Sequence, residues 1–354
     1  MRGEQDNSFL KWFALFVLIV QNSGLALTMR YSRISKSADE TYIATTAVLV
    51  AEIVKLVIST ALCFGQDCRY DIGRFRELLR HEFVDGRKEF MKLFVPSGLY
   101  VIQNNLQYVA TSNLPAEIYQ VLAQMKIITT AIFSVIMLSK KQSTYQWLSI
   151  IALTVGIALV QTSQGKGGHT DKTQNNLLGL VCVLIGACTS GFAGVYFEKV
   201  LKSTNSSIWL RNMQLAVIGI GFSGIGCIAS DLDAIQKYGF FKGYDSLVWI
   251  VIMLAAAGGL VVAVVVKYAD NVLKGFATCA SIVLSCAVSS MVFQDSTINM
   301  LFVLGSTVVT GSAYVYSQNP APQTTIKSST PPNGIKDENL DLAPLLSKNS
   351  AISS

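Results

Sequence analysis

The sequence has few charged residues for its length. Asp, Glu, Lys and Arg together make up 14% of the 354 residues, whereas hydrophobic residues make up 51%. The mean hydropathy is +0.45. In soluble domains roughly a quarter of the residues are charged. The composition therefore excludes an ordinary soluble domain and indicates a protein of the lipid bilayer.

The sequence also lacks the residues of a metal centre or a disulfide framework. It has only two histidines and seven cysteines, and no two cysteines form a Cys-x-x-Cys pair. All the cysteines except Cys68 fall in apolar stretches. We therefore expect no disulfide framework, no metal site and no cofactor. The formal net charge of +6 is typical of a membrane protein with basic loops, and we infer no nucleic-acid partner from it.

Long apolar runs separated by short polar breaks predict an all-α membrane protein with ten transmembrane helices, since about 20 apolar residues span a bilayer. The first run is too long for a signal-peptide core, and we interpret it as a retained span. The predicted helices are 9–29, 42–64, 93–111, 116–138, 144–162, 177–197, 209–229, 246–268, 272–294 and 297–317. Residues 1–317 thus form the transmembrane domain, and residues 318–354, rich in Pro, Ser, Thr and Asn, form a tail predicted to be disordered.

The basic residues predict the orientation. If the N-terminus is cytosolic, eighteen of the 28 Lys and Arg residues lie on the cytosolic side and seven on the other. Cytosolic loops of membrane proteins carry such an excess, so both termini are expected in the cytosol.

Two similar turns suggest an internal repeat. Tyr108–Asn113 separates the third and fourth predicted helices, and Tyr268–Asn271 separates the eighth and ninth. Because they lie an odd number of helices apart, the second copy would be inserted upside down, which gives a 5+5 inverted repeat. A chance match of short turns explains the similarity equally well.

Lys126 is the clearest functional candidate. It lies in the middle of a predicted span, and Glu117 is too far along the chain to face it. Placing an ammonium group in the middle of a membrane costs about 2.5–3.5 kcal/mol, so such a lysine usually has a function. Attracting and binding a phosphate is one such function. Lys274, on the repeat-related ninth helix, would join it at a diphosphate. The alternatives are that Lys126 reaches the interface or pairs with another helix, and that Lys274 is an ordinary charge at a helix end.

Other polar residues in the spans have two interpretations each. Glu52 and Lys55 are three residues apart on one helix, which favours a structural ion pair, with a role near a sugar or in gating as the alternative. Tyr100, Asn104 and Asn212 suit stacking on and hydrogen bonding to a base, but contacts between helices account for them equally well.

The segment Ser190–Gly194 carries small residues, which provide either close helix packing or room for a ligand. Asp231 and Asp233 match the Asp-x-Asp motif of metal-dependent glycosyltransferases. Because they lie in a short loop without a soluble catalytic domain, we interpret them as a solvated acidic pair and expect no enzyme.

Five segments resemble the nucleotide-sugar transporter family that contains the UDP-galactose, UDP-N-acetylglucosamine and CMP-sialic acid transporters. They are Val101–Leu114, Thr129–Leu138, Gly191–Lys202, Trp209–Gln214 and Val264–Gly275. The resemblance covers about residues 9–317. It implies a drug/metabolite-transporter fold, a Golgi or ER membrane, and exchange of a cytosolic nucleotide sugar for a lumenal nucleoside monophosphate.

The resemblance also implies roles for individual residues. Lys126 and Lys274 match the phosphate-binding lysines of the family. The residues that match the nucleotide pocket are Tyr100, Asn104, Tyr119, Ser190 and Asn212.

Three positions depart from the family pattern. Leu122 and Ala123 replace Thr and Tyr before the fourth-helix lysine, and Ala216 stands where the CMP-sialic acid member has Tyr. The sequence favours a UDP-sugar, either UDP-N-acetylglucosamine or UDP-galactose, exchanged for UMP, with CMP-sialic acid and CMP as the alternative.

The tail carries a further candidate signal, since Asp341–Leu346 fits an acidic-dileucine sorting motif. It leaves open an endosomal location and a non-transporting scaffold that acts through its tail. A homodimer also remains open.

Overall fold

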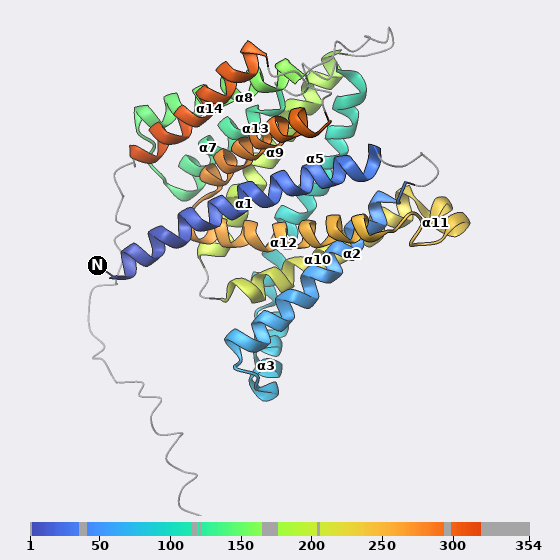
Figure 1. Cartoon of the computed structure of the whole chain (residues 1–354). Coiled ribbons are helices and arrows are strands. Elements are labelled where there is room, and N and C mark those ends of the chain that lie inside the picture. Colours follow the sequence, from blue (N-terminus) through green and yellow to red (C-terminus); the bar gives the residue numbers. More distant parts are fainter. Residues whose placement is uncertain are drawn as a thin grey trace, which may run out of the picture. The chain divides into compact units, whose positions relative to one another are not determined.

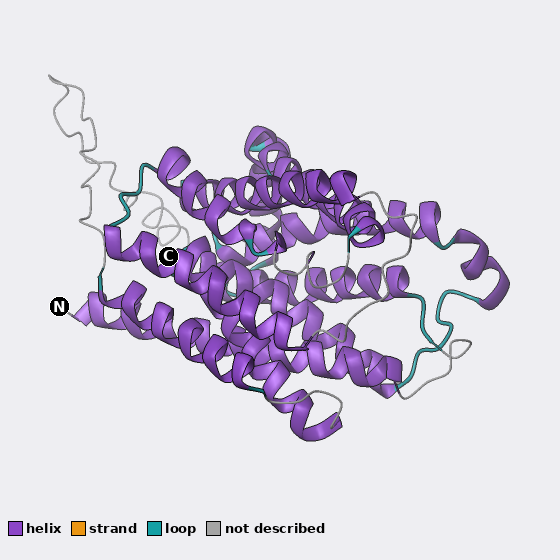
Figure 2. Ribbon diagram, turned by 90° about the horizontal axis from the view of Figure 1, so that it is seen from above, coloured by secondary structure: helices purple, strands orange, loops and turns teal. Residues whose placement is uncertain are grey.

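A computed structural model describes residues 2–34, 41–114, 119, 122–164, 176–203, 206–293 and 299–319. Within these ranges the secondary structure is helical and no strand occurs (Figures 1 and 2). The long helices are α1 (Arg2–Ile34), α2 (Ala44–Leu62), α5 (Phe94–Asn113), α7 (Met125–Leu138), α8 (Thr144–Gln164), α9 (Asn176–Lys202), α10 (Ile208–Ser230), α12 (Ser246–Tyr268), α13 (Asn271–Phe293) and α14 (Met300–Gln318).

Eight stretches of the described chain are long and apolar enough to cross a membrane. They are Leu10–Met29, Ala44–Asp67, Thr144–Ser163, Leu177–Lys202, Ile208–Ser230, Ser246–Tyr268, Asn271–Met291 and Met300–Gln318. At the other two predicted positions lie α5, which includes Gln103 and Gln107, and α7, which is apolar but shorter. Large apolar side chains such as Phe16, Ile136 and Met300 are exposed, as expected where helices face lipid. The chain is therefore a multi-pass membrane protein.

The prediction of short loops between the spans is wrong in two places. Residues 69–92 fold into α3 (Ile72–Leu79), the π-helical turn η3 (Arg80–Asp85) and α4 (Arg87–Lys92), and a further short helix, α11, covers Leu232–Tyr238. Asp71 caps α3 by accepting hydrogen bonds from the backbone N–H groups of Gly73 and Arg74. The apolar side of α3 packs on α10, which explains why so charged a segment is helical.

Polar contacts define one end of the helix bundle, which we call face A. The Lys140 ammonium, between α7 and α8, donates to Glu198 Oε1 near the end of α9 at 2.7 Å. Glu198 Oε2 accepts from the backbone N–H of Asn271, the first residue of α13, at 2.9 Å. Ser143, before α8, donates to the carbonyl of Asn319 after α14. The ends of α7, α9 and α14 and the starts of α8 and α13 therefore meet at face A.

The opposite end, face B, is held by a separate set of contacts. Thr45, at the start of α2, donates to Asp231 at the end of α10 over 2.6 Å. Asn299, before α14, donates to the carbonyl of Ser163 near the end of α8. The Asp231 carboxylate is thus engaged in a helix contact. Successive long helices alternate in direction between the two faces, as in a membrane bundle.

Glycines allow two helix pairs to approach closely. A Cβ at Gly156 of α8 would lie 3.0 Å from the backbone nitrogen of Val309 in α14, and one at Gly305 of α14 would lie 2.7 Å from the carbonyl oxygen of Gly156. A Cβ at Gly191 of α9 would lie 2.6 Å from Thr129 Oγ1 in α7. Such small residues let helices pack tightly in lipid, where little hydrophobic driving force holds them together.

Candidate functional site

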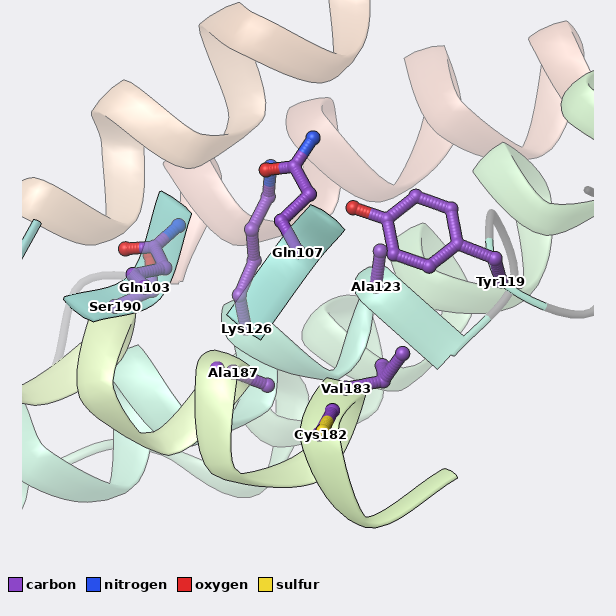
Figure 3. A pocket seen from close by; sticks show the side chains of 10 residues that line it. Gln103, Gln107, Tyr119, Ala123, Lys126, Cys182, Val183, Ala187 and Ser190 are labelled. Atoms are coloured by element: carbon purple, nitrogen blue, oxygen red, sulfur yellow. The ribbon is translucent and has the colours of Figure 1, made fainter. Parts of the chain in front are cut away.

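A pocket lies among α5, α7 and α9, around the side chain of Lys126 (Figure 3). Polar groups line it together with small and apolar ones, a mixture typical of small-molecule sites. Its lining residues are Gln103, Gln107, Tyr119, Ala123, Lys126, Cys182, Val183, Gly186, Ala187 and Ser190.

The helix directions place this pocket within the bundle. On α9, which begins at face B, the lining residues run from Cys182 to Ser190 and stop well before Glu198 at face A. On α5, which ends at face B, Gln103 and Gln107 lie in the middle and second half. The pocket therefore extends from the middle of the bundle towards face B.

Lys126 lies in the first turn of α7, where neighbouring threonines bond to its backbone carbonyl. Its carbonyl accepts hydrogen bonds from the hydroxyls of Thr129 at 3.0 Å and Thr130 at 2.6 Å. The Thr129 hydroxyl also donates to the carbonyl of Ala187 in α9 at 2.8 Å, which ties the two walls together. In Figure 3 the Lys126 side chain points in the same direction as that of Gln107.

The Lys126 ammonium makes no ion pair with any carboxylate in the described ranges. An ion pair with another helix, one of the two alternatives to a phosphate-binding role, is therefore not seen in these ranges. Glu117 lies outside the described residues. An uncompensated cation inside a polar pocket attracts an anion.

Lys274 lies on α13, three residues after its start, and is half-buried. It does not line the pocket, but its ammonium is close enough to that of Lys126 for the two like charges to repel each other, and Glu198 acts on it with the opposite sign. The charges of Lys126 and Lys274, which lie far apart in the sequence, therefore act on each other in the structure. A bound anion between them would relieve the repulsion.

Of the other predicted site residues, some line the pocket and some do not. Tyr119 and Ser190 line the pocket. Tyr100 does not and is 37% exposed, while Asn212 is fully buried on α10 and donates to the carbonyl of Ile208. The side chain of Asn104 lies outside the described residues.

Glu52 and Lys55 form the predicted ion pair on α2, with Lys55 Nζ 2.5 Å from Glu52 Oε2. A Cβ at Gly219 of α10 would collide with the Glu52 carboxylate, and one at Gly259 of α12 would collide with the Lys55 side chain. The pair therefore packs against α10 and α12, and neither residue lines the pocket.

Residues 6–317 match the nucleotide-sugar transporter family. The chain belongs to this family. It is 46% identical over 316 residues to the UDP-N-acetylglucosamine transporter of Rattus norvegicus, which covers 88% of this chain and 97% of the relative. It is 46% identical over 309 residues to the UDP-galactose translocator of Canis lupus familiaris, with coverage of 87% and 77%. A UDP-N-acetylglucosamine/UDP-N-acetylgalactosamine transporter of Caenorhabditis elegans, nstp-4, is 44% identical over 327 residues, with coverage of 90% and 96%.

One solved structure has the same fold at 13% identity. It matches with a TM-score of 0.61 over 86% of this chain and 96% of its own. The sequence-based resemblance to nucleotide-sugar transporters is thus confirmed, and so is the expectation that the protein is a transporter and not an enzyme.

Sequence reasoning missed several lining residues of this nucleotide-sugar transporter. Gln103 and Gln107 are one helical turn apart in an apolar span, and that spacing was the available signal. Position 123, where the family pattern has Tyr, lines the pocket as Ala123. Leu122 packs instead in an apolar cluster with Ala110.

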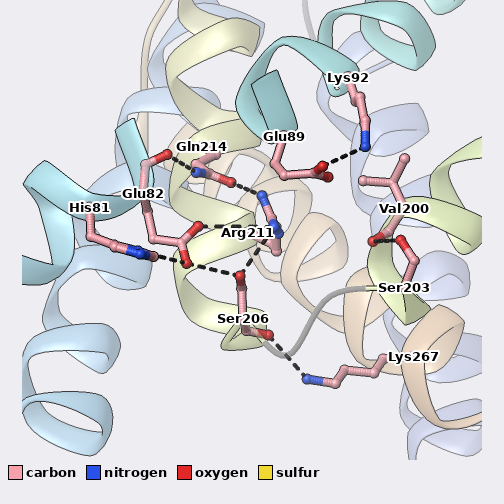
Figure 4. Close-up of polar contacts among 10 residues, drawn as sticks. All are labelled: His81, Glu82, Glu89, Lys92, Val200, Ser203, Ser206, Arg211, Gln214 and Lys267. Atoms are coloured by element: carbon pink, nitrogen blue, oxygen red, sulfur yellow. Dashed lines mark hydrogen bonds and ion pairs between the residues drawn. The ribbon is translucent and has the colours of Figure 1, made fainter. Parts of the chain in front are cut away.

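A second polar cluster of the transporter lies at face A (Figure 4). Arg211 on α10 is only 1% exposed; it donates to Gln214 at 2.7 Å and to the Ser206 hydroxyl at 3.1 Å. Its guanidinium lies 4.0 Å from the Glu82 carboxylate in η3, and Ser206 donates to that carboxylate as well. Gln214 donates to the carbonyl of Glu82. The cluster therefore fastens the segment α3–α4 to the start of α10.

Proposed function

We propose that this protein is an antiporter that moves a UDP-sugar from the cytosol into the Golgi lumen and returns UMP. The observation that carries the proposal is Lys126, an ammonium without an ion-pair partner among the described residues, in a polar pocket and under the influence of Lys274. Two cations from different halves of the chain match a diphosphate in charge. Named relatives with 46% identity transport UDP-N-acetylglucosamine or UDP-galactose, and these are the substrates we propose.

The proposed architecture is a drug/metabolite-transporter fold with ten spans in a 5+5 inverted repeat. The eight apolar stretches, together with α5 and α7, lie at the ten predicted positions. In this arrangement Lys126 and Lys274 occupy equivalent helices of the two halves. A site between inverted halves can face one side at a time, which is the basis of alternating access.

We place face A in the cytosol. Face A carries the basic segment 69–92, Lys140, Lys141 and Lys202, in line with the excess of Lys and Arg expected there. The pocket then lies in the lumenal half of the bundle.

Exchange and substrate are tested by uptake into proteoliposomes. Purified protein is reconstituted with UMP or CMP inside, and radiolabelled UDP-N-acetylglucosamine, UDP-galactose or CMP-sialic acid is added outside. We expect uptake of at least one UDP-sugar to be accelerated by internal UMP. Acceleration of CMP-sialic acid by CMP alone would favour the CMP-sugar alternative, and no uptake of any substrate by folded protein would refute transport.

The role of Lys126 is tested by Lys126→Ala. Loss of hydrogen bonds to a charged phosphate costs about 1.5–3 kcal/mol, so we expect the KM for the UDP-sugar to rise roughly 10- to 150-fold. Lys126→Arg keeps the charge and should retain part of the activity. The matched control is Lys141→Ala, an exposed lysine at face A, which should transport normally. Unchanged transport by Lys126→Ala would refute the assignment.

A further inference from the structure

Glu198 is a fully buried carboxylate at face A with several partners. It lies near the end of α9 with 0% side-chain exposure. Its Oε1 atom accepts from Lys140 at 2.7 Å and from Lys202 at 2.8 Å, and its Oε2 atom accepts from the backbone N–H of Asn271 at 2.9 Å. A buried charge is tolerated only when it is paired and hydrogen-bonded in this way.

The contacts of Glu198 join the two halves of the chain. Lys140 belongs to the first half, in the connection between α7 and α8, whereas Glu198 and Asn271 belong to the second. Lys140 also lies 3.6 Å from the Asp270 carboxylate. Burial opposes the charge on Lys140, but the carboxylates of Asp270 and Glu198 outweigh it and raise the pKa of Lys140 above its ordinary value. The lysine is therefore charged at physiological pH.

The cluster lies between the pocket and face A. The pocket ends at Ser190 on α9, and Glu198 follows two helical turns later on the same helix. Gly194 lies between them, and a Cβ there would collide with the Asn271 side chain. On this side of the pocket, α9 and α13 are thus in direct contact. Lys140 pairs with Glu198 on α9 and with Asp270, the residue before α13.

The same cluster is connected to the lysine pair. Lys274 lies three residues after Asn271 on α13, so the backbone that Glu198 holds is the one that carries Lys274. Glu198 attracts the Lys274 ammonium, whereas Lys126 repels it. A bound phosphate would compete with Glu198 for Lys274 and add negative charge near the Glu198 carboxylate.

We infer that Glu198 is a positioning residue that holds the transport site closed at face A through Lys140 and Asn271, and that a polyanion bound at Lys126 and Lys274 releases this latch. The inference rests on the proposed function, since it assigns the closed side and the trigger of exchange. It explains why the pocket extends towards face B in this structure. It also explains coupling, because the empty site keeps the latch closed and the occupied site opens it.

The first test compares the KM for the UDP-sugar from each face in sidedness-controlled proteoliposomes. Glu198→Gln removes the charge that holds Lys140, so the closed state at face A should lose population. We expect the KM from face A to fall and the KM from face B to rise, each by about threefold or more. A purely structural defect would lower the maximal rate without moving the two values in opposite directions. Equal KM values for the variant and the wild type from both faces would overturn the latch.

Three further variants keep this test decisive. Lys140→Gln replaces a half-exposed residue and breaks the same contact if Glu198→Gln does not fold. The double variant should show a smaller shift than the sum of the two single ones, because both substitutions remove the Glu198–Lys140 pair. Lys199→Gln, an exposed lysine next to Glu198, is the matched control and should behave like the wild type.

The second test does not depend on transport. Cys182 lines the pocket in the half near face B, so a chain with Cys182 as its single cysteine reports access from that face. A membrane-impermeant maleimide added at face B should label the wild type, and Glu198→Gln should reduce the labelling rate at least about twofold. UMP should reduce it in the wild type as well. If Glu198→Gln reduces the labelling rate but the wild type does not exchange, the proposed function fails and the latch stands; if the wild type exchanges but Glu198→Gln labels at the wild-type rate, the latch fails alone.

Discussion

Arg211→Ala should destabilise the protein more than most single substitutions. The guanidinium is 1% exposed and supplies two hydrogen bonds, to Gln214 and Ser206, besides its ion pair with Glu82. Glu82 is only 14% exposed, so the substitution would leave a largely buried carboxylate without its cation. Breaking a buried pair from one side costs about 3–5 kcal/mol. We expect a loss of this size in the free energy of unfolding.

The assay is reversible unfolding in mixed micelles, followed by intrinsic fluorescence as the denaturing detergent increases. Arg74→Ala is the matched control, because Arg74 lies on α3, in the same segment as Glu82, is 65% exposed and pairs with exposed Asp71 at 3.6 Å. It should cost no more than about 1 kcal/mol. In a double-mutant cycle, Arg211→Ala combined with Glu82→Gln should cost less than the sum of the two. A loss below about 1 kcal/mol for Arg211→Ala, or strict additivity, would refute the buried-cluster argument.

Three further outcomes follow from the structure. Gly191→Leu should lower stability by about 1–3 kcal/mol in the same unfolding assay, since even a Cβ would collide with α7, whereas Gly224→Ala, which meets open space, should not. Ala123→Tyr should fill part of the pocket and change the ratio of KM values for UDP-N-acetylglucosamine and UDP-galactose by about tenfold; an unchanged ratio in proteoliposome uptake would place position 123 away from the sugar. A chain ending at Gln318 should transport normally in proteoliposomes, and a loss of transport would point to a functional tail.

The long helices could be predicted because hydrophobic runs of about 20 residues report the thickness of a bilayer directly. The segment 69–92 is not among the predicted helices because its charges hide an amphipathic pattern. In the structure Phe75, Leu78 and Leu79 face α10, while the arginines face outwards. The sequence contains this periodicity, but a search for long, fully apolar runs does not detect it.

Lys126 was found in the sequence because a charge inside an apolar span has few explanations. The neighbours of Lys126 were harder to find. Gln103 and Gln107 lie in a helix that is remote in sequence from Lys126, and only helix packing brings them to the same pocket. Glu198 was not singled out, since a glutamate between lysines near a helix end looks like an ordinary surface charge until burial is known.

The contact between α8 and α14 limits how the bundle can move. At Gly156 and Gly305 the two helices are so close that a Cβ on either glycine would collide with backbone atoms of the other helix. Separating them would expose peptide groups and an empty groove to lipid, with nothing nearby to fill it. We therefore expect the two helices to move as one unit, without separating, in any rearrangement that transfers a substrate.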